Sequence, residues 1–150
     1  MRFHKLFIVF LMLHTTSYAS SFQDLFMVAD KNKSAAEELL ATSEKCKSQS
    51  NLNMAYYAVA KMLMANHVLN PYKKLSYFNE GKSLLEKCIQ TEHENPEIIF
   101  LRYSVQVHAP SFLGYSSHMK DDKAFLKNNL SKIKNQHLRQ AIISVLSKQL

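Results

Sequence analysis

Apolar residues recur along much of the chain with the spacing of one face of an α-helix. Two segments show the i, i+3, i+4, i+7 pattern most clearly: Phe22, Leu25, Phe26 and Ala29, and later Leu138, Ala141, Ile142, Val145 and Leu146. Between them, residues 54–69 are apolar nearly all round, with Lys61, Asn66 and His67 as the strongly polar exceptions. A helix of that composition belongs at the centre of a packed structure. The pattern therefore predicts an all-α fold built around residues 54–69.

A capping pattern predicts a helix before this central segment. Ser34 and Glu37 have the spacing of a capping box, in which the serine hydroxyl accepts from the N3 amide and the glutamate reaches back to the cap amide. The helix is expected to end near Cys46. Four of its residues are expected to face inward: Ala36, Leu39, Leu40 and Ser43.

The dipeptide Asn-Pro marks two further helix starts. Asparagine is a favoured N-cap, and proline suits the first helical turn because its missing N–H has no partner there. Asn70-Pro71 predicts a helix over residues 71–90, and Asn95-Pro96 one over residues 97–108. The first is expected to bury Leu75, Phe78, Leu85, Cys88 and Ile89. Gly81 within it costs about 1 kcal/mol relative to alanine, so we expect close approach of a neighbouring helix there.

Residues 97–108 also carry the alternation of a strand. Leu101, Tyr103, Val105 and Val107 alternate with polar residues, whereas Ile98, Leu101 and Val105 keep helical spacing. A lone strand would leave unpaired backbone groups, so we expect a helix. With two last helices at residues 124–133 and 136–150, the prediction is an array of six to seven helices in antiparallel hairpins.

Residues 85–97, LEKCIQTEHENPE, resemble the end of one tetratricopeptide repeat and the turn into the next. Gly81 and Cys88 match the small-residue positions of that motif, and its turn is matched by Glu92, Asn95, Pro96 and Glu97. His93 stands where the turn proline is usual. The resemblance lies within residues 54–108. It implies tetratricopeptide-like stacked hairpins that bind partner proteins, and it implies no chemistry.

Residues 1–19 have the three parts of a secretory signal peptide. Arg2 and Lys5 give a positive start, residues 6–13 are apolar, and Ser17 and Ala19 place small residues at positions −3 and −1. Eight apolar residues are too few to cross a hydrocarbon core of about 30 Å. The sequence therefore predicts cleavage after Ala19, or one or two residues later. The product would be one exported domain, residues 20–150, in the periplasm or outside the cell, with no transmembrane segment.

Export leaves two alternatives open for Cys46 and Cys88. An oxidising compartment permits one disulfide between them, and both fall near the ends of predicted helices. Each also lies on an apolar helical stripe, where free cysteine packs as a small core residue.

After the predicted leader, the excess positive charge lies in the last quarter of the chain. Residues 117–150 carry seven basic and two acidic residues. On a helix, Lys120, Lys123, Lys127 and Lys134 would fall within about 60° of one another. Such a stripe attracts an anionic envelope surface or an acidic protein, and it also serves as a solvated face. Nucleic acid is not expected as a partner, because the segment lacks interleaved exposed aromatic residues and the protein is expected outside the cytoplasm.

The pattern predicts no catalytic residue, metal or cofactor. The histidines after residue 19 never pair at i+3 or i+4, and two glycines 33 positions apart cannot form a phosphate loop. The paired carboxylates fall at helix starts or turns, where they meet the positive end of the helix dipole: Glu37 with Glu38, Glu92 with Glu94, and Asp121 with Asp122.

The loop between the fifth and sixth predicted helices is unusually apolar. Pro110 and Gly114 break the helix, while Phe112, Leu113 and Tyr115 are too apolar for a solvated linker. These side chains either fold back as a plug over a helix seam or form a partner-binding patch.

We therefore expect an exported, non-catalytic protein-interaction or assembly module. Its contact surface would combine the apolar loop residues with the basic stripe: Phe112, Leu113, Tyr115, Lys120, Lys123 and Lys127. The alternative is an exported small-ligand-binding protein or enzyme, with a site under the loop at 108–118 that uses His108, Tyr115 or His118.

Overall fold

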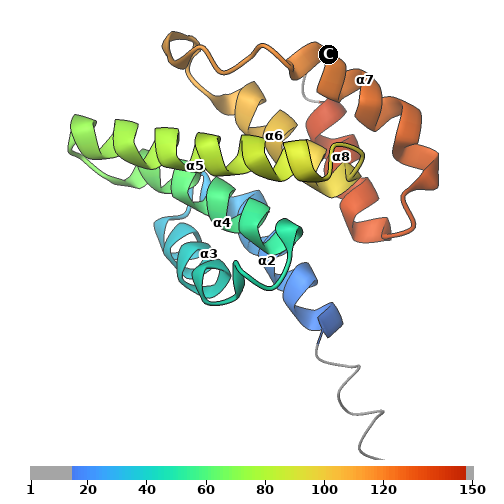
Figure 1. Cartoon of the computed structure of the whole chain (residues 1–150), viewed down its shortest axis with the longest axis horizontal. Helices are drawn as coiled ribbons and strands as arrows, with labels where there is room; N and C mark the ends of the chain where they lie inside the picture. Colours follow the sequence, from blue (N-terminus) through green and yellow to red (C-terminus); the bar gives the residue numbers. More distant parts are fainter. Residues whose placement is uncertain (1–14, 148–150) are drawn as a thin grey trace, which may run out of the picture.

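The computed structural model describes the backbone of residues 15–147 and the side chains of residues 22–147. Over this range the chain is helical and contains no strand. The α-helices are α2 Thr15–Ala29, α3 Lys33–Cys46, α4 Asn51–Met64, α5 Pro71–Thr91, α6 Pro96–His108, α7 Met119–Asn129 and α8 Gln136–Ser147 (Figure 1). Short 3-10 turns follow three of them: η1 Ala65–His67, η2 Ser111–Leu113 and η3 Leu130–Lys132. The all-α prediction is confirmed.

The predicted leader falls largely outside this range. Its residues 1–14 are not among those described, and residues 15–19 begin α2. None of the helices between residues 15 and 147 combines the length and apolar composition that a membrane span requires.

Helix α4 is the centre of the structure, as its composition predicts. It packs against α2, α3, α5 and α6, and Figure 1 shows α5 lying along it with α2 and α3 on its other side. Eight of its residues are buried: Ala55, Tyr56, Tyr57, Ala58, Val59, Ala60, Met62 and Met64. Leu69, at the end of the predicted core segment, is instead 98% exposed. The helix ends at Met64, so Leu69 lies in the connection to α5 and belongs to no buried face.

Gly81 lets α5 approach α4 closely, as expected. A Cβ atom at this position would overlap the Ala58 carbonyl oxygen and lie 2.5 Å from the Met62 Cγ atom. These separations are shorter than any van der Waals contact, so only glycine fits here without movement of α4.

Both Asn-Pro helix starts are confirmed, whereas the predicted capping box is wrong. Asn70 and Asn95 each cap a helix, their side-chain oxygens accepting two backbone N–H bonds. Helix α3 begins at Lys33, with the Asn32 side chain accepting from the Ala35 amide at 3.1 Å. Ser34 therefore lies inside the first turn, where its hydroxyl does not serve as the cap.

Two further boundaries differ from the prediction. Helix α7 begins at Met119, earlier than the expected residue 124, and ends at Asn129. Lys134 therefore lies beyond α7, and the basic stripe contains only Lys120, Lys123 and Lys127. Leu75, expected in the core, is 49% exposed because it lies at the edge of an open groove.

The burial of α6 explains why residues 97–108 carry the spacing of a helix and the alternation of a strand. The alternating polar residues Arg102, Ser104 and Gln106 are buried along with the apolar ones. A helix enclosed on nearly every side shows no clear amphipathic period.

The two cysteines are free thiols in this structure. Cys88 is buried and Cys46 is partly buried. The first turn of α4 is tied to the C-terminal ends of α3 and α5, because the Asn53 and Asn51 side-chain amides donate to the Cys46 and Cys88 carbonyls at 3.2 and 2.9 Å.

Candidate binding groove

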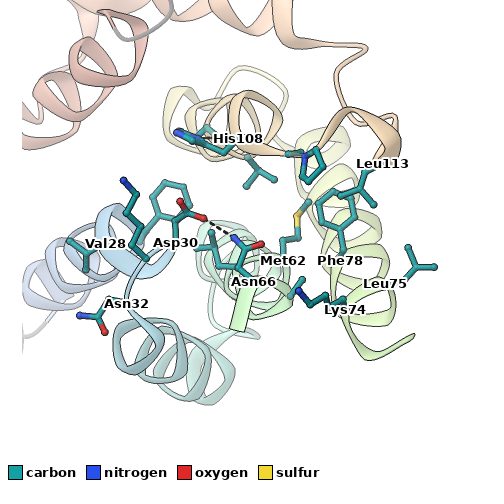
Figure 2. A pocket seen from close by; sticks show the side chains of 18 of the residues that line it. Val28, Asp30, Asn32, Met62, Asn66, Lys74, Leu75, Phe78, His108 and Leu113 are labelled. Atoms are coloured by element: carbon teal, nitrogen blue, oxygen red, sulfur yellow. Dashed lines mark hydrogen bonds between the residues drawn. The ribbon is translucent and has the colours of Figure 1, made fainter. Parts of the chain in front are cut away.

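A groove of about 1110 Å³ opens where the ends of several helices meet. Its walls come from the C-terminal end of α2, the end of α4 with η1, the first two turns of α5, and the end of α6 with the loop after it. Its inner surface is mainly apolar. Figure 2 shows Met62, Phe78 and Leu113 meeting on one side of this space, each contributed by a different segment.

The rim of the groove gathers apolar side chains that the fold leaves exposed. Seven large apolar residues are exposed among the described side chains, and four of them line this groove: Met27, Val28, Leu75 and Phe112. Scattered exposed apolar residues are ordinary on a protein surface, whereas several of them around one hollow are typical of interaction sites.

The polar residues in the lining differ in how they are engaged. Asp30 accepts a hydrogen bond of 2.7 Å from the Asn66 amide (Figure 2). Lys31 and Lys74 have no carboxylate within ion-pair distance among the described residues. Ser104 is 6% exposed, and its hydroxyl has no hydrogen-bond partner. The groove therefore offers unengaged cations and one unengaged hydroxyl.

The apolar loop is divided between the two roles considered for it. Phe112 is 84% exposed at the groove rim, and Leu113 lines the groove beside it. Gly114 turns the chain with a φ of 59°, in the left-handed region. Tyr115 then points inward at 4% exposure, its ring edge-on to Phe78 at 5.8 Å between centroids. Tyr115 acts as a plug, whereas Phe112 extends from the surface.

A buried polar network holds the loop and α7 against α5 and α6. Arg102 donates to Asp122 through Nε and Nη2 at 2.8 and 2.6 Å, and to Glu86 through Nη1 at 3.0 Å. Gln106 donates to Asp122 at 2.8 Å, and the Tyr115 hydroxyl donates to Glu86 at 2.5 Å. Asp122 lies in the first turn of α7, as its predicted place at a helix start requires. It is also 2% exposed, because it packs against the guanidinium, and the sequence did not indicate this burial.

The network also changes the protonation behaviour of its members. Burial disfavours the Arg102 charge, but Asp122 and Glu86 outweigh this effect and hold the pKa of Arg102 above its ordinary value. Burial and then the bond to Glu86 raise the pKa of Tyr115. Both groups therefore keep their protons, and their hydrogen bonds, across the physiological range.

Of the other predicted residues, only His108 lines the groove. Lys120, Lys123 and Lys127 are on α7, and none of them contributes to the walls. His108 lines the groove, and its Nδ1–H donates to the Ser104 carbonyl at 2.8 Å. Tyr115 and the exposed His118 do not line it, so the three residues named for an enzyme site do not share this cavity.

The remaining candidate chemistry is structural. His67 donates through Nε2 to the Ala29 carbonyl at 2.7 Å, which ties η1 to the end of α2. No group of three or more histidine, cysteine or acidic residues among the described side chains is arranged to hold a metal ion.

Sequence reasoning singled out three residues on the loop side of the groove, His108, Phe112 and Leu113, but neither its other walls nor the network. Asp30, Lys74 and Ser104 carry no local motif, and the three separate segments that contain them have to fold before they line one groove. The one available signal was the run of polar residues at alternate positions of α6, because polar groups in a central helix require partners.

No protein-family model matches the chain, and no curated protein or solved structure gives a significant match. The tetratricopeptide resemblance of residues 85–97 stays a prediction.

Proposed function

We propose that the protein is a non-catalytic binding module whose recognition site is the groove between α2, α4, α5 and the end of α6. The observation that carries this proposal is the preformed apolar hollow with four exposed apolar side chains around it. Ligand sites typically are concave and mostly apolar, with volumes of about 300–1,000 Å³ and a few placed polar groups. The leader pattern adds the expectation that the module acts outside the cytoplasm.

The exposed rim gives a guest its driving force. Each apolar side chain that a guest covers contributes about 25 cal/mol for every Å² removed from water. Among the four rim residues, Phe112 has the largest exposed fraction that a guest could cover, and about half of Leu75 is also exposed. Because Tyr115 anchors the loop that carries Phe112, little conformational entropy is lost when a guest contacts it.

Binding of a neutral apolar dye, N-phenyl-1-naphthylamine, tests the proposal. The dye fluoresces in apolar surroundings, and we expect saturable binding to the purified protein. Phe112→Ser removes a rim side chain and is expected to weaken dye binding about fivefold, the equivalent of about 1 kcal/mol of lost contact.

Tyr72→Ser is the matched control for this variant. Tyr72 is 85% exposed, almost the same fraction as Phe112, but it does not line the groove. Leu75→Gln and Leu69→Gln make a second pair of the same kind. Both variants of each pair should keep the circular dichroism spectrum and thermal midpoint of the parent. Absence of dye binding, or equal losses in the two members of each pair, would refute the groove as the recognition site.

A further inference from the structure

The groove lining has an excess of positive charge. Lys31 and Lys74 line it together with one carboxylate, Asp30, whose oxygen is already engaged by the Asn66 amide. Two cations against one anion leave a net charge of +1. Figure 2 shows the Lys74 side chain extending from α5 toward the middle of the groove, near Met62.

The Ser104 hydroxyl is a second sign of a missing partner. Buried hydroxyl groups nearly always form hydrogen bonds, and leaving one unpaired costs about 1–3 kcal/mol. Ser43, the other buried serine of the described part, donates to the Leu39 carbonyl. Ser104 is also buried, at 6% exposure, but it lines the groove and donates to nothing. A guest that brings a polar atom would complete it.

Building on the proposed function, we propose that the guest is a small amphiphile with an apolar chain and one anionic head group. The chain lies along the wall formed by Met62, Phe78 and Leu113, and the head group is held by Lys74 and Lys31. A polar atom of the guest accepts from the Ser104 hydroxyl.

A partner helix fits these observations less well. An α-helix is about 10–12 Å across and satisfies its own backbone hydrogen bonds, so it presents mainly side-chain ends to a groove. An acidic amphipathic helix would meet the lysines, but its backbone carbonyls are already hydrogen-bonded and would not serve as acceptors for the Ser104 hydroxyl. A slender chain with an anionic head uses the hollow, the charge and the hydroxyl together.

The test compares two amphiphiles that differ in head charge. Dodecanoate and undecyltrimethylammonium carry the same alkyl chain, and each is titrated, below its micelle concentration and at low salt, against the protein carrying the neutral dye. We expect dodecanoate to displace the dye at a concentration about tenfold lower. Lys74→Gln should weaken dodecanoate about three- to fivefold and leave the cationic amphiphile unaffected.

Lys73→Gln is the matched control, because Lys73 is the exposed neighbour of Lys74 and does not line the groove. Ser104→Ala gives an independent readout. It should raise the thermal midpoint of the free protein, by removing an unpaired buried hydroxyl, and at the same time weaken dodecanoate binding.

The dye has no charge, so the two proposals fail in different ways. If the dye binds in the groove but both amphiphiles compete equally and Lys74→Gln changes neither, the anionic amphiphile is refuted and the binding groove stands. Displacement by an acidic amphipathic peptide but not by dodecanoate would also refute it, in favour of a protein partner. If the dye does not bind, the proposed function itself fails.

Discussion

Arg102 on α6 and Asp122 on α7 form a bidentate ion pair in which both side chains are less than one-tenth exposed. A buried pair of this kind is costly to break, because the remaining charge loses its partner without regaining water. Asp122→Ala leaves the guanidinium with Glu86 alone. We expect it to lower the free energy of unfolding by about 3–5 kcal/mol, measured by urea denaturation.

Asp121→Ala is the natural control, since Asp121 is the exposed neighbour in the same helical turn. It should change the free energy of unfolding by less than about 0.5 kcal/mol. Similar losses for both variants would mean that the carboxylate acts through the helix dipole rather than through the ion pair.

Gly81→Ala is expected to destabilise the protein, although alanine is the better helix former. The added methyl group would overlap the Ala58 carbonyl and press on Met62, and overpacking of this kind costs about 1–3 kcal/mol. Ser83→Ala, at an exposed position of the same helix, should be neutral or slightly stabilising. Thermal unfolding of the two variants checks this prediction. A gain in stability from Gly81→Ala would show that α4 can move aside freely.

The cap of α3 can be assigned by substitution. Asn32→Ala removes the acceptor for the Ala35 amide and should cost about 1 kcal/mol, whereas Ser34→Ala should cost almost nothing. Chemical denaturation of both variants distinguishes them. A larger loss from Ser34→Ala would restore the capping box that the sequence suggested.

Glu97 should make stability fall as the pH rises. Burial raises the pKa of this carboxyl, partly offset by the hydrogen bond that the Tyr56 hydroxyl donates to it. The folded state therefore binds the proton more tightly than the unfolded chain does. This contribution is complete below the ordinary glutamate pKa, and it is lost as the pH rises through the folded value.

Glu97→Gln removes this titration and keeps an acceptor for Tyr56. Relative to the parent, the variant should gain stability in urea denaturation as the pH rises above the ordinary glutamate pKa. Glu94→Gln, in the exposed turn before α6, should show no such trend. A pH-independent difference at Glu97 would contradict the burial that raises its pKa.

The thiols should differ in reactivity. Burial raises the pKa of Cys88 to about 11 and also raises that of the partly buried Cys46. The thiolate is the reactive form, so alkylation of the native protein should label Cys46 first and Cys88 only as the structure opens. Mass spectrometry of the labelled peptides measures both rates. If the denatured protein shows no free thiol, the two cysteines form the disulfide that the sequence left open.

Features encoded within one turn of the chain were predictable, and those that depend on two helices were not. The Asn70 and Asn95 caps follow from adjacent residues and are correct. The Asn32 cap was not predicted, because Ser34 and Glu37 together match the two-residue capping-box motif. The actual cap depends on where α2 ends and the chain turns into α3, and no local motif encodes that position. Leu75 has the spacing of a core residue, but its face of α5 borders a hollow.

The polar network is another feature that depends on two helices and could not be predicted from local sequence. Arg102 and Asp122 are 20 positions apart, and nothing local indicates that α7 returns to cover α6. The composition of α4 was informative because a helix without a polar face has to be enclosed, wherever its neighbours come from.

The walls of the groove are contributed by segments that are distant in sequence, so the unfolded chain has no counterpart of it. Any molecule that the groove accepts consequently associates with the native state alone, and mass action then stabilises that state by about 2.7 kcal/mol at a free concentration of 100 times the dissociation constant. A melting-temperature screen can therefore rank candidate compounds without an assay of biological activity.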